Sequence, residues 1–135
     1  MSACWKPVYS GGIAFTNLPL NQGDKLTMEI SGNGELRFAA VQIDPIFFSN
    51  LRKFYNTENI IRPICTRKLQ TTFPEVVTIT RGRKQDSDTL LMHSVTGRYK
   101  HFANVIRSKS VWIMTEIIYG TVSIEFSKCF MYNRI

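Results

Sequence analysis

The sequence contains few of the residues from which catalytic and metal sites are built. Its 135 residues include three Cys and two His, and no two Cys are spaced as C-x-x-C. It has no Gly-rich phosphate-binding motif and no G-x-S-x-G nucleophile elbow. These absences argue against a zinc enzyme, a nucleotide-binding enzyme and a serine hydrolase. We therefore expect no enzymatic activity, no catalytic residue, no cofactor and no metal ion.

Long apolar runs are missing as well. No stretch approaches the roughly 20 residues that cross a bilayer, and the first residues lack the apolar core of a secretion signal. An odd number of Cys without motif spacing fits reduced thiols better than a disulfide framework. The sequence therefore predicts an intracellular protein, cytoplasmic or nuclear, without a transmembrane segment.

What the sequence does contain is strand-like alternation. Leu26, Met28 and Ile30 alternate with polar residues, and residues 121–126 repeat this pattern. The length suits one domain over residues 1–135. Short alternating segments with frequent Gly and Pro turns predict an all-β fold, an antiparallel β-sandwich of about eight short strands with little helix.

Turn-forming residues indicate where these strands are connected. We expect Ser31-Gly-Asn-Gly to be the loop of a hairpin between strands at residues 26–30 and 35–43. Residues 46–72 are expected to be the least regular part, because Pro63 limits any long element there.

The charge of the chain is unevenly distributed. Its formal net charge is +7, from 17 Lys and Arg against 10 Asp and Glu. Residues 51–110 hold twelve of these cations against four acidic residues. A basic segment of this kind favours a negatively charged partner such as an acidic peptide, a nucleic acid or an anionic lipid. A solvated surface without a partner is the alternative.

This basic segment contains aromatic side chains among its cations, a combination that can neutralise a charged partner and stack on it. The predicted partner-binding residues are Arg52, Lys53, Tyr55, Arg67, Lys68, Arg81, Arg83, Lys84, Arg98 and Lys100. If the partner is a nucleic acid, we expect replacement of Arg83 and Lys84 by Glu to abolish binding.

The sequence contains two pairs of titratable residues of the types that serve in catalytic sites. His93 and His101 fall in a predicted hairpin, and Asp86 and Asp88 fall in the polar loop 82–88. No aromatic cleft signature accompanies the carboxylates. We therefore expect both Asp side chains to be solvated and both His side chains to be structural or exposed.

The last nine residues, 127–135, are rich in apolar side chains. Phe130, Met131, Tyr132 and Ile135 are unfavourable in water, so we expect this tail to dock on the domain or on a second copy. A sandwich also has edge strands to which a peptide or a second copy can add. The sequence leaves both a monomer and a homodimer open.

Four segments occur in the order in which they occur in a known family. The first reads Ile13-Ala-Phe-Thr-Asn-Leu-Pro-Leu, and the second reads Leu36-Arg-Phe-Ala-Ala-Val-Gln-Ile-Asp-Pro. A late hairpin spans residues 91–102 around a Gly turn, and the closing segment reads Ser110-Val-Trp-Ile-Met-Thr-Glu-Ile-Ile-Tyr-Gly-Thr-Val-Ser-Ile. Over residues 8–126 these segments resemble a divergent Neuralized homology repeat.

The resemblance implies an antiparallel β-sandwich used for protein recognition. Members of the family bind short peptide segments in regulators and targets of ubiquitin ligases, and some associate with anionic phosphoinositides. Such repeats are usually found beside a RING finger, for which three Cys and two His are too few. A stand-alone copy implies a non-catalytic adaptor that binds a peptide segment of a partner. The alternative is a nucleic-acid-binding protein that uses residues 51–110.

Overall fold

The computed structural model describes residues 7–10, 12–47 and 61–126, and most of them lie in strands. This part of the chain contains seven strands and one short 3-10 helix. In chain order they are β1 (Pro7–Ser10), β2 (Ile13–Thr16), β3 (Lys25–Val41), η1 (Pro45–Phe47), β4 (Ile61–Arg83), β5 (Asp88–Ser94), β6 (Lys100–Val105) and β7 (Trp112–Phe126). The prediction of an all-β fold with little helix is confirmed. The strands are longer than predicted, with 17, 23 and 15 residues in β3, β4 and β7.

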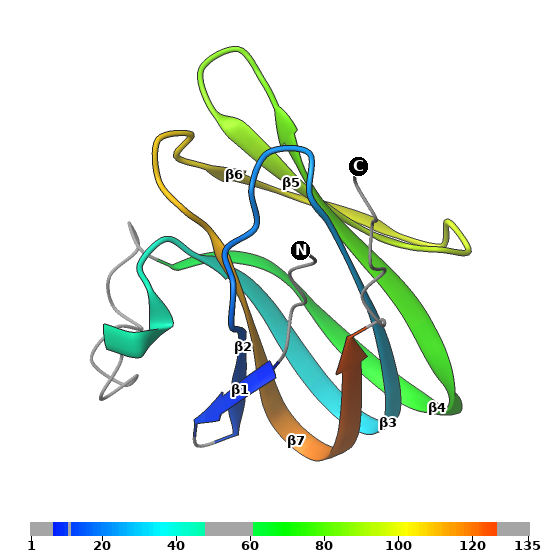
Figure 1. The fold of residues 1–135 in the computed structure, drawn as a ribbon. Coiled ribbons are helices and arrows are strands. Elements are labelled where there is room, and N and C mark those ends of the chain that lie inside the picture. Colours follow the sequence, from blue (N-terminus) through cyan, green and yellow to red (C-terminus); the bar gives the residue numbers. More distant parts are fainter. Residues whose placement is uncertain (1–6, 11, 48–60, 127–135) are drawn as a thin grey trace, which may run out of the picture.

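The seven strands form one antiparallel sheet (Figure 1). Their order across the sheet is β1-β2-β7-β3-β4-β5-β6. The central strand β3 pairs along most of its length with β4 on one side and with β7 on the other. The shorter strands extend the sheet at its two ends, β2 and β1 beyond β7, and β5 and β6 beyond β4.

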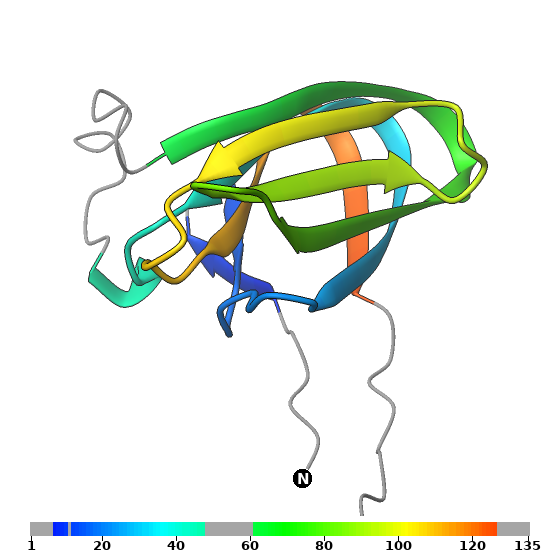
Figure 2. The ribbon, with the colours of Figure 1, turned by 90° about the horizontal axis from the view of Figure 1, so that it is seen from above.

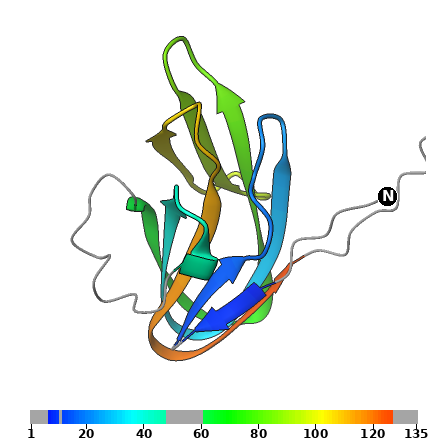
Figure 3. The ribbon, with the colours of Figure 1, turned by 60° about the vertical axis from the view of Figure 1, so that its left-hand side comes forward.

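The sheet folds back on itself along a crease that crosses its long strands (Figures 1 and 3). At the crease, Gly32 and Gly34 of β3 have φ values of 113° and 156°, and Gly120 of β7 has a φ value of 90°. Gly34 pairs with Gly120, and a Cβ added to Gly120 would lie 2.6 Å from the Gly34 Cα. Glycine alone fits this backbone conformation and this close approach. The strands therefore bend sharply while they stay paired.

The crease divides the sheet into two layers that pack face to face (Figure 2). Layer A consists of β1, β2 and the parts of β3, β4 and β7 at residues 34–41, 61–70 and 112–119. Layer B consists of β5, β6 and the parts of β3, β4 and β7 at residues 25–30, 75–83 and 122–126. One continuous sheet thus supplies both faces of a sandwich.

Apolar side chains from both layers fill the space between them. Leu26, Met28 and Ile30 of layer B and Leu36 and Phe38 of layer A are at most 1% exposed. These residues alternate along β3 with side chains that face outward, as strand geometry requires. Burial of each such side chain contributes about 1.5–3 kcal/mol to stability. The burial of Leu26, Met28 and Ile30 confirms that the alternation in the sequence marks core positions.

Two predicted features of the chain path are wrong. Residues 31–34 do not form a hairpin loop but lie inside β3, because their glycines bend a continuous strand at the crease. Residues 61–72, expected to be irregular, lie in β4. Pro63 is tolerated there because this stretch, within the described residues, pairs with β3 alone and has no second ladder to supply with an N–H. The expected docking of residues 127–135 lies outside the described residues.

Candidate functional site

Two strand edges lie side by side on one flank of the molecule. In the described residues, the first part of β4 pairs only with β3, since β5 joins β4 from Val77 onward. Among the described strands, β6 lies at the end of the sheet and pairs only with β5. β6 runs beside the first part of β4 without pairing with it (Figure 2). The strip formed by residues 61–70 and 98–105 is called the seam below.

Side chains bridge the seam where backbone hydrogen bonds do not. The guanidinium carbon of Arg67 lies 4.2 Å from the centre of the Tyr99 ring, and the Arg67 Nη2 atom lies 3.0 Å from a Glu75 carboxylate oxygen. The Arg67 Nε atom and the Tyr99 hydroxyl are buried and find no hydrogen-bond partner among the described residues. A stacked and ion-paired arginine therefore holds β4 against the residue that precedes β6.

Burial raises the pKa values of two side chains in the seam, Cys65 and Tyr99. It raises the pKa of the Cys65 thiol to about 11, and the nearby charge of Arg67 lowers that pKa by a smaller amount. Burial also raises the pKa of the Tyr99 hydroxyl, and the charge of Glu75 adds to this shift. Cys65 is therefore a neutral thiol at pH 7 and lacks the thiolate character that a nucleophile needs.

Four of the predicted binding residues lie at or next to the contact between Arg67 and Tyr99. Arg67 stacks on Tyr99, Lys68 follows Arg67 in β4, and Arg98 and Lys100 flank Tyr99 in the sequence. Lys68, Arg98 and Lys100 are exposed, and none of them forms an ion pair within the described part of the chain. This end of the seam therefore presents positive charge to the solvent.

More cations lie at the other end of the seam, where β4 begins. Exposed Arg62 lines a depression of about 280 Å³ together with residues 86–87 and 104–107. The predicted binding residues Arg83 and Lys84 are exposed at and just after the end of β4. In the sequence they shortly precede residues 86–87, which line the depression. This end of the seam therefore carries the cation of Arg62 and, in the same depression, the carboxylate of Asp86. The remaining predicted surface residues, Arg52, Lys53 and Tyr55, lie outside the described residues.

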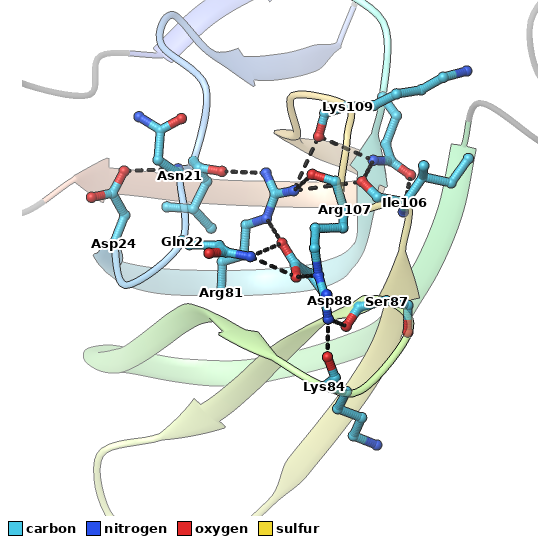
Figure 4. Close-up of polar contacts among 12 residues, drawn as sticks. Asn21, Gln22, Asp24, Arg81, Lys84, Ser87, Asp88, Ile106, Arg107 and Lys109 are labelled. Carbon is cyan, nitrogen blue, oxygen red and sulfur yellow. Dashed lines mark hydrogen bonds and ion pairs between the residues drawn. The ribbon is translucent and has the colours of Figure 1, made fainter.

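Arg81 lies in the interior rather than on this surface (Figure 4). It is 4% exposed, and its Nε atom donates to the Asp88 carboxylate at 2.8 Å. Its Nη1 atom donates to the carbonyl oxygen of Leu20, and its Nη2 atom donates to the carbonyl oxygens of Arg107 and Lys109. Arg81 thus ties the loops before β3 and after β6 to the end of β4. Because it is buried, it does not belong to the surface formed by the other predicted binding residues.

Asp88 lies at the centre of the same contacts and is fully buried, so the prediction that it is solvated is wrong. Its carboxylate also accepts hydrogen bonds from Arg107 at 3.0 Å and from Gln22 at 2.9 Å (Figure 4). Burial by itself would raise the pKa of Asp88, but the hydrogen bonds from Gln22, Arg107 and Arg81 outweigh it and lower the pKa. These four residues are called the anchor network below.

The family of the chain is not identified by its similarity to known proteins. Neither a family model, nor a curated protein, nor a solved structure matches it. Within residues 7–10, 12–47 and 61–126, no three His, Cys, Asp or Glu residues gather as they would around a metal ion. The same ranges contain no helix that is long and apolar enough to cross a membrane. The seam is therefore characterised by its own geometry and charge.

Proposed function

We propose that this chain is a non-catalytic adaptor that binds an extended, acidic segment of a partner protein along the seam. The observation that carries this proposal is the presence of the exposed cations Lys68, Arg98 and Lys100 on two strand edges that, among the described residues, pair with no further strand. Acidic side chains of the segment would face these cations, and strand edges offer N–H and C=O groups to an extended chain. The resemblance to Neuralized homology repeats supports the same kind of partner, in a ubiquitin-ligase pathway.

A nucleic acid is the second candidate, and one observation favours it. Phe102 of β6 is 62% exposed and follows Lys100 by two residues. An exposed aromatic ring near a cation can stack on a base while the cation contacts a phosphate. Both candidates use the same cations, so they differ in how strongly binding depends on salt and in the chemistry of the bound chain.

Selection of peptides from a random library tests the proposal. We expect peptides of about twelve residues, displayed on phage and selected on this protein, to be enriched in Asp and Glu. The affinity of a synthetic selected peptide, measured by fluorescence anisotropy, should fall at least about 10-fold in the double variant Lys68→Glu/Lys100→Glu. A 10-fold loss corresponds to about 1.4 kcal/mol of binding free energy.

The matched control changes the same amount of charge outside the seam. Lys25 and Lys109 are both exposed, and Lys25→Glu/Lys109→Glu should change the affinity by less than about twofold. Selected peptides without acidic enrichment, or equal losses in the two double variants, would contradict the proposal. A labelled oligothymidine that binds more tightly than the peptides, and loses affinity steeply between about 50 and about 200 mM salt, would favour the nucleic acid instead.

A further inference from the structure

The last part of β7 is an open edge of layer B. Across layer B the strands follow the order β7-β3-β4-β5-β6. β2 pairs with β7 only at residues 114–116, which belong to layer A. Residues 120–126 therefore pair with β3 on one side and with no described strand on the other. In Figure 1 they form the end of the β7 arrow, beside β3.

This edge lacks the features that usually keep strand edges from pairing. Three exposed residues, Thr121, Ser123 and Glu125, alternate along it with apolar residues that pack against the core and are only partly buried. Edge strands are commonly protected by Lys or Pro, and residues 120–126 contain neither. Every second residue of an antiparallel strand presents both its N–H and its C=O group to the same side. The edge can therefore accept a further strand.

Charge distinguishes this edge from the seam. Glu125 lies directly opposite Glu29 of β3, and both side chains are exposed. In the part of the chain that the structure describes, neither carboxylate forms a salt bridge. An acidic segment of the kind proposed for the seam would meet like charge here, which is unfavourable between neighbouring strands. The edge of β7 therefore suits a different occupant.

A second copy of the same strand fits this edge without a conflict of charge. Glu125 is the only charged residue in the segment 120–126. In an antiparallel pair centred on Ser123, Glu125 faces Thr121 of the second copy, and Val122 faces Ile124 of the second copy. The two Glu125 side chains then lie about 13 Å apart along the strands, which exceeds the Debye length of about 8 Å at physiological salt.

The chain's own residues 127–135 are the competing occupant of the edge. To fold back tightly along β7, they would have to reverse direction at Ser127 and Lys128. Two-residue hairpin turns favour Gly, Asn or Asp because they need positive φ values. The sequence after β7 therefore lacks the signal for a tight reversal, and a second copy is favoured.

We propose that two copies of this chain pair through residues 120–126 of β7, about a two-fold axis at Ser123. The pairing joins the two copies of layer B into one sheet, with about six backbone hydrogen bonds across the interface. One strand per copy buries less surface than a standard interface, so the dimer dissociates on dilution. Because β7 and β6 lie at opposite edges of layer B, the dimer carries a seam at each end. The inference is independent of the proposed function, since it uses neither the seam nor an acidic partner.

Two lysine substitutions on the same face of β7 test the dimer and its register. Sedimentation velocity of the unaltered protein should show the average mass rising with concentration from that of one chain toward that of two. Ser123→Lys places two lysines opposite each other across the axis and should raise the Kd of the dimer at least about 10-fold. Thr121→Lys is the matched control, because its lysine faces Glu125 of the second copy, and it should not raise the Kd.

The pattern of the two effects decides the inference. A loss confined to Ser123→Lys supports pairing of β7 in this register, and Ser123→Glu should weaken the dimer to a similar degree because it also places like charges across the axis. Equal effects of Ser123→Lys and Thr121→Lys, including no effect of either, overturn the inference. A monomer at every concentration also overturns it, because the edge is then covered by residues 127–135 or by solvent. Both substituted positions are exposed, and circular dichroism verifies that the variants are folded.

Discussion

Asp88→Asn is expected to lower the free energy of unfolding by about 3–5 kcal/mol, because it leaves buried Arg81 without a compensating charge. The carboxylate accepts hydrogen bonds from three side chains of the anchor network, and a neutral amide replaces one acceptor oxygen by a donor. Urea denaturation of the two proteins at pH 7 measures the difference directly.

Asp86→Asn is the control for this substitution. Asp86 is exposed two residues before Asp88, and its replacement should change stability by less than about 0.5 kcal/mol. A loss for Asp88→Asn that is no larger than the loss for Asp86→Asn would show that the anchor network does not stabilise this end of the sandwich.

The same carboxylate gives stability a predictable dependence on pH. The pKa of Asp88 is lowered in the folded chain, whereas an unfolded chain titrates near an ordinary value of about 3.9. Between these two values the unfolded state binds more protons, so stability must fall as the pH falls. The contribution of Asp88 is therefore complete above about pH 5 and is lost as the pH drops through 3.9 toward the lower folded pKa. Asp88→Asn should remove this part of the acid sensitivity.

Gly120→Ala is expected to have the second large effect, a loss of about 1–3 kcal/mol beyond the ordinary cost of a positive φ. The new Cβ would collide with the carbonyl oxygen of Asn33 and with the Cα of Gly34, both of them backbone atoms of the neighbouring strand. Neither can move without opening the pairing of β3 with β7 at the crease. Thermal unfolding followed by circular dichroism measures the loss.

Gly97→Ala separates the collision from the backbone strain. Gly97 has a φ value of 75°, close to the 90° of Gly120, but a Cβ there would meet no atom within 4 Å. This control should lose only about 1 kcal/mol, the cost of the left-handed conformation. Equal losses at the two glycines would mean that the close approach at the crease does not constrain the fold.

Much of the architecture could be predicted from local pattern, and the crease could not. The alternation of Leu26, Met28 and Ile30 identified a buried face, because period-two alternation is a property of the strand itself. Ser31-Gly-Asn-Gly is equally compatible with a reversal of the chain and with a bend in a straight strand. Whether the chain reverses or the strand bends here depends on Gly120, which lies far along the sequence and pairs with Gly34. A long-range pairing of this kind leaves no mark in a local window.

For the charged residues too, the sequence could have indicated some features of the site and not others. Charge alone put Arg81 on the binding surface and Asp88 in a solvated loop, and the structure buries both. A signal for burial was present, since Arg81 continues the alternation of Val77 and Ile79 and Asp88 begins that of Leu90 and Met92. Opposite charges on the inward face of two neighbouring strands indicate a buried pair. By contrast, the contact between Arg67 and Tyr99 depends on how β6 lies against β4, which the sequence does not show.

The binding of an acidic segment along the seam is the central claim, and it is tested most directly by nuclear magnetic resonance of the ¹⁵N-labelled protein during titration with a selected acidic peptide. Strand addition beside β4 predicts that the largest amide shifts occur at residues 61–70, with smaller shifts at residues 98–102 and none at the crease. Largest shifts at residues 106–110 or 119–122, with the amides of residues 61–70 unchanged, would contradict the claim.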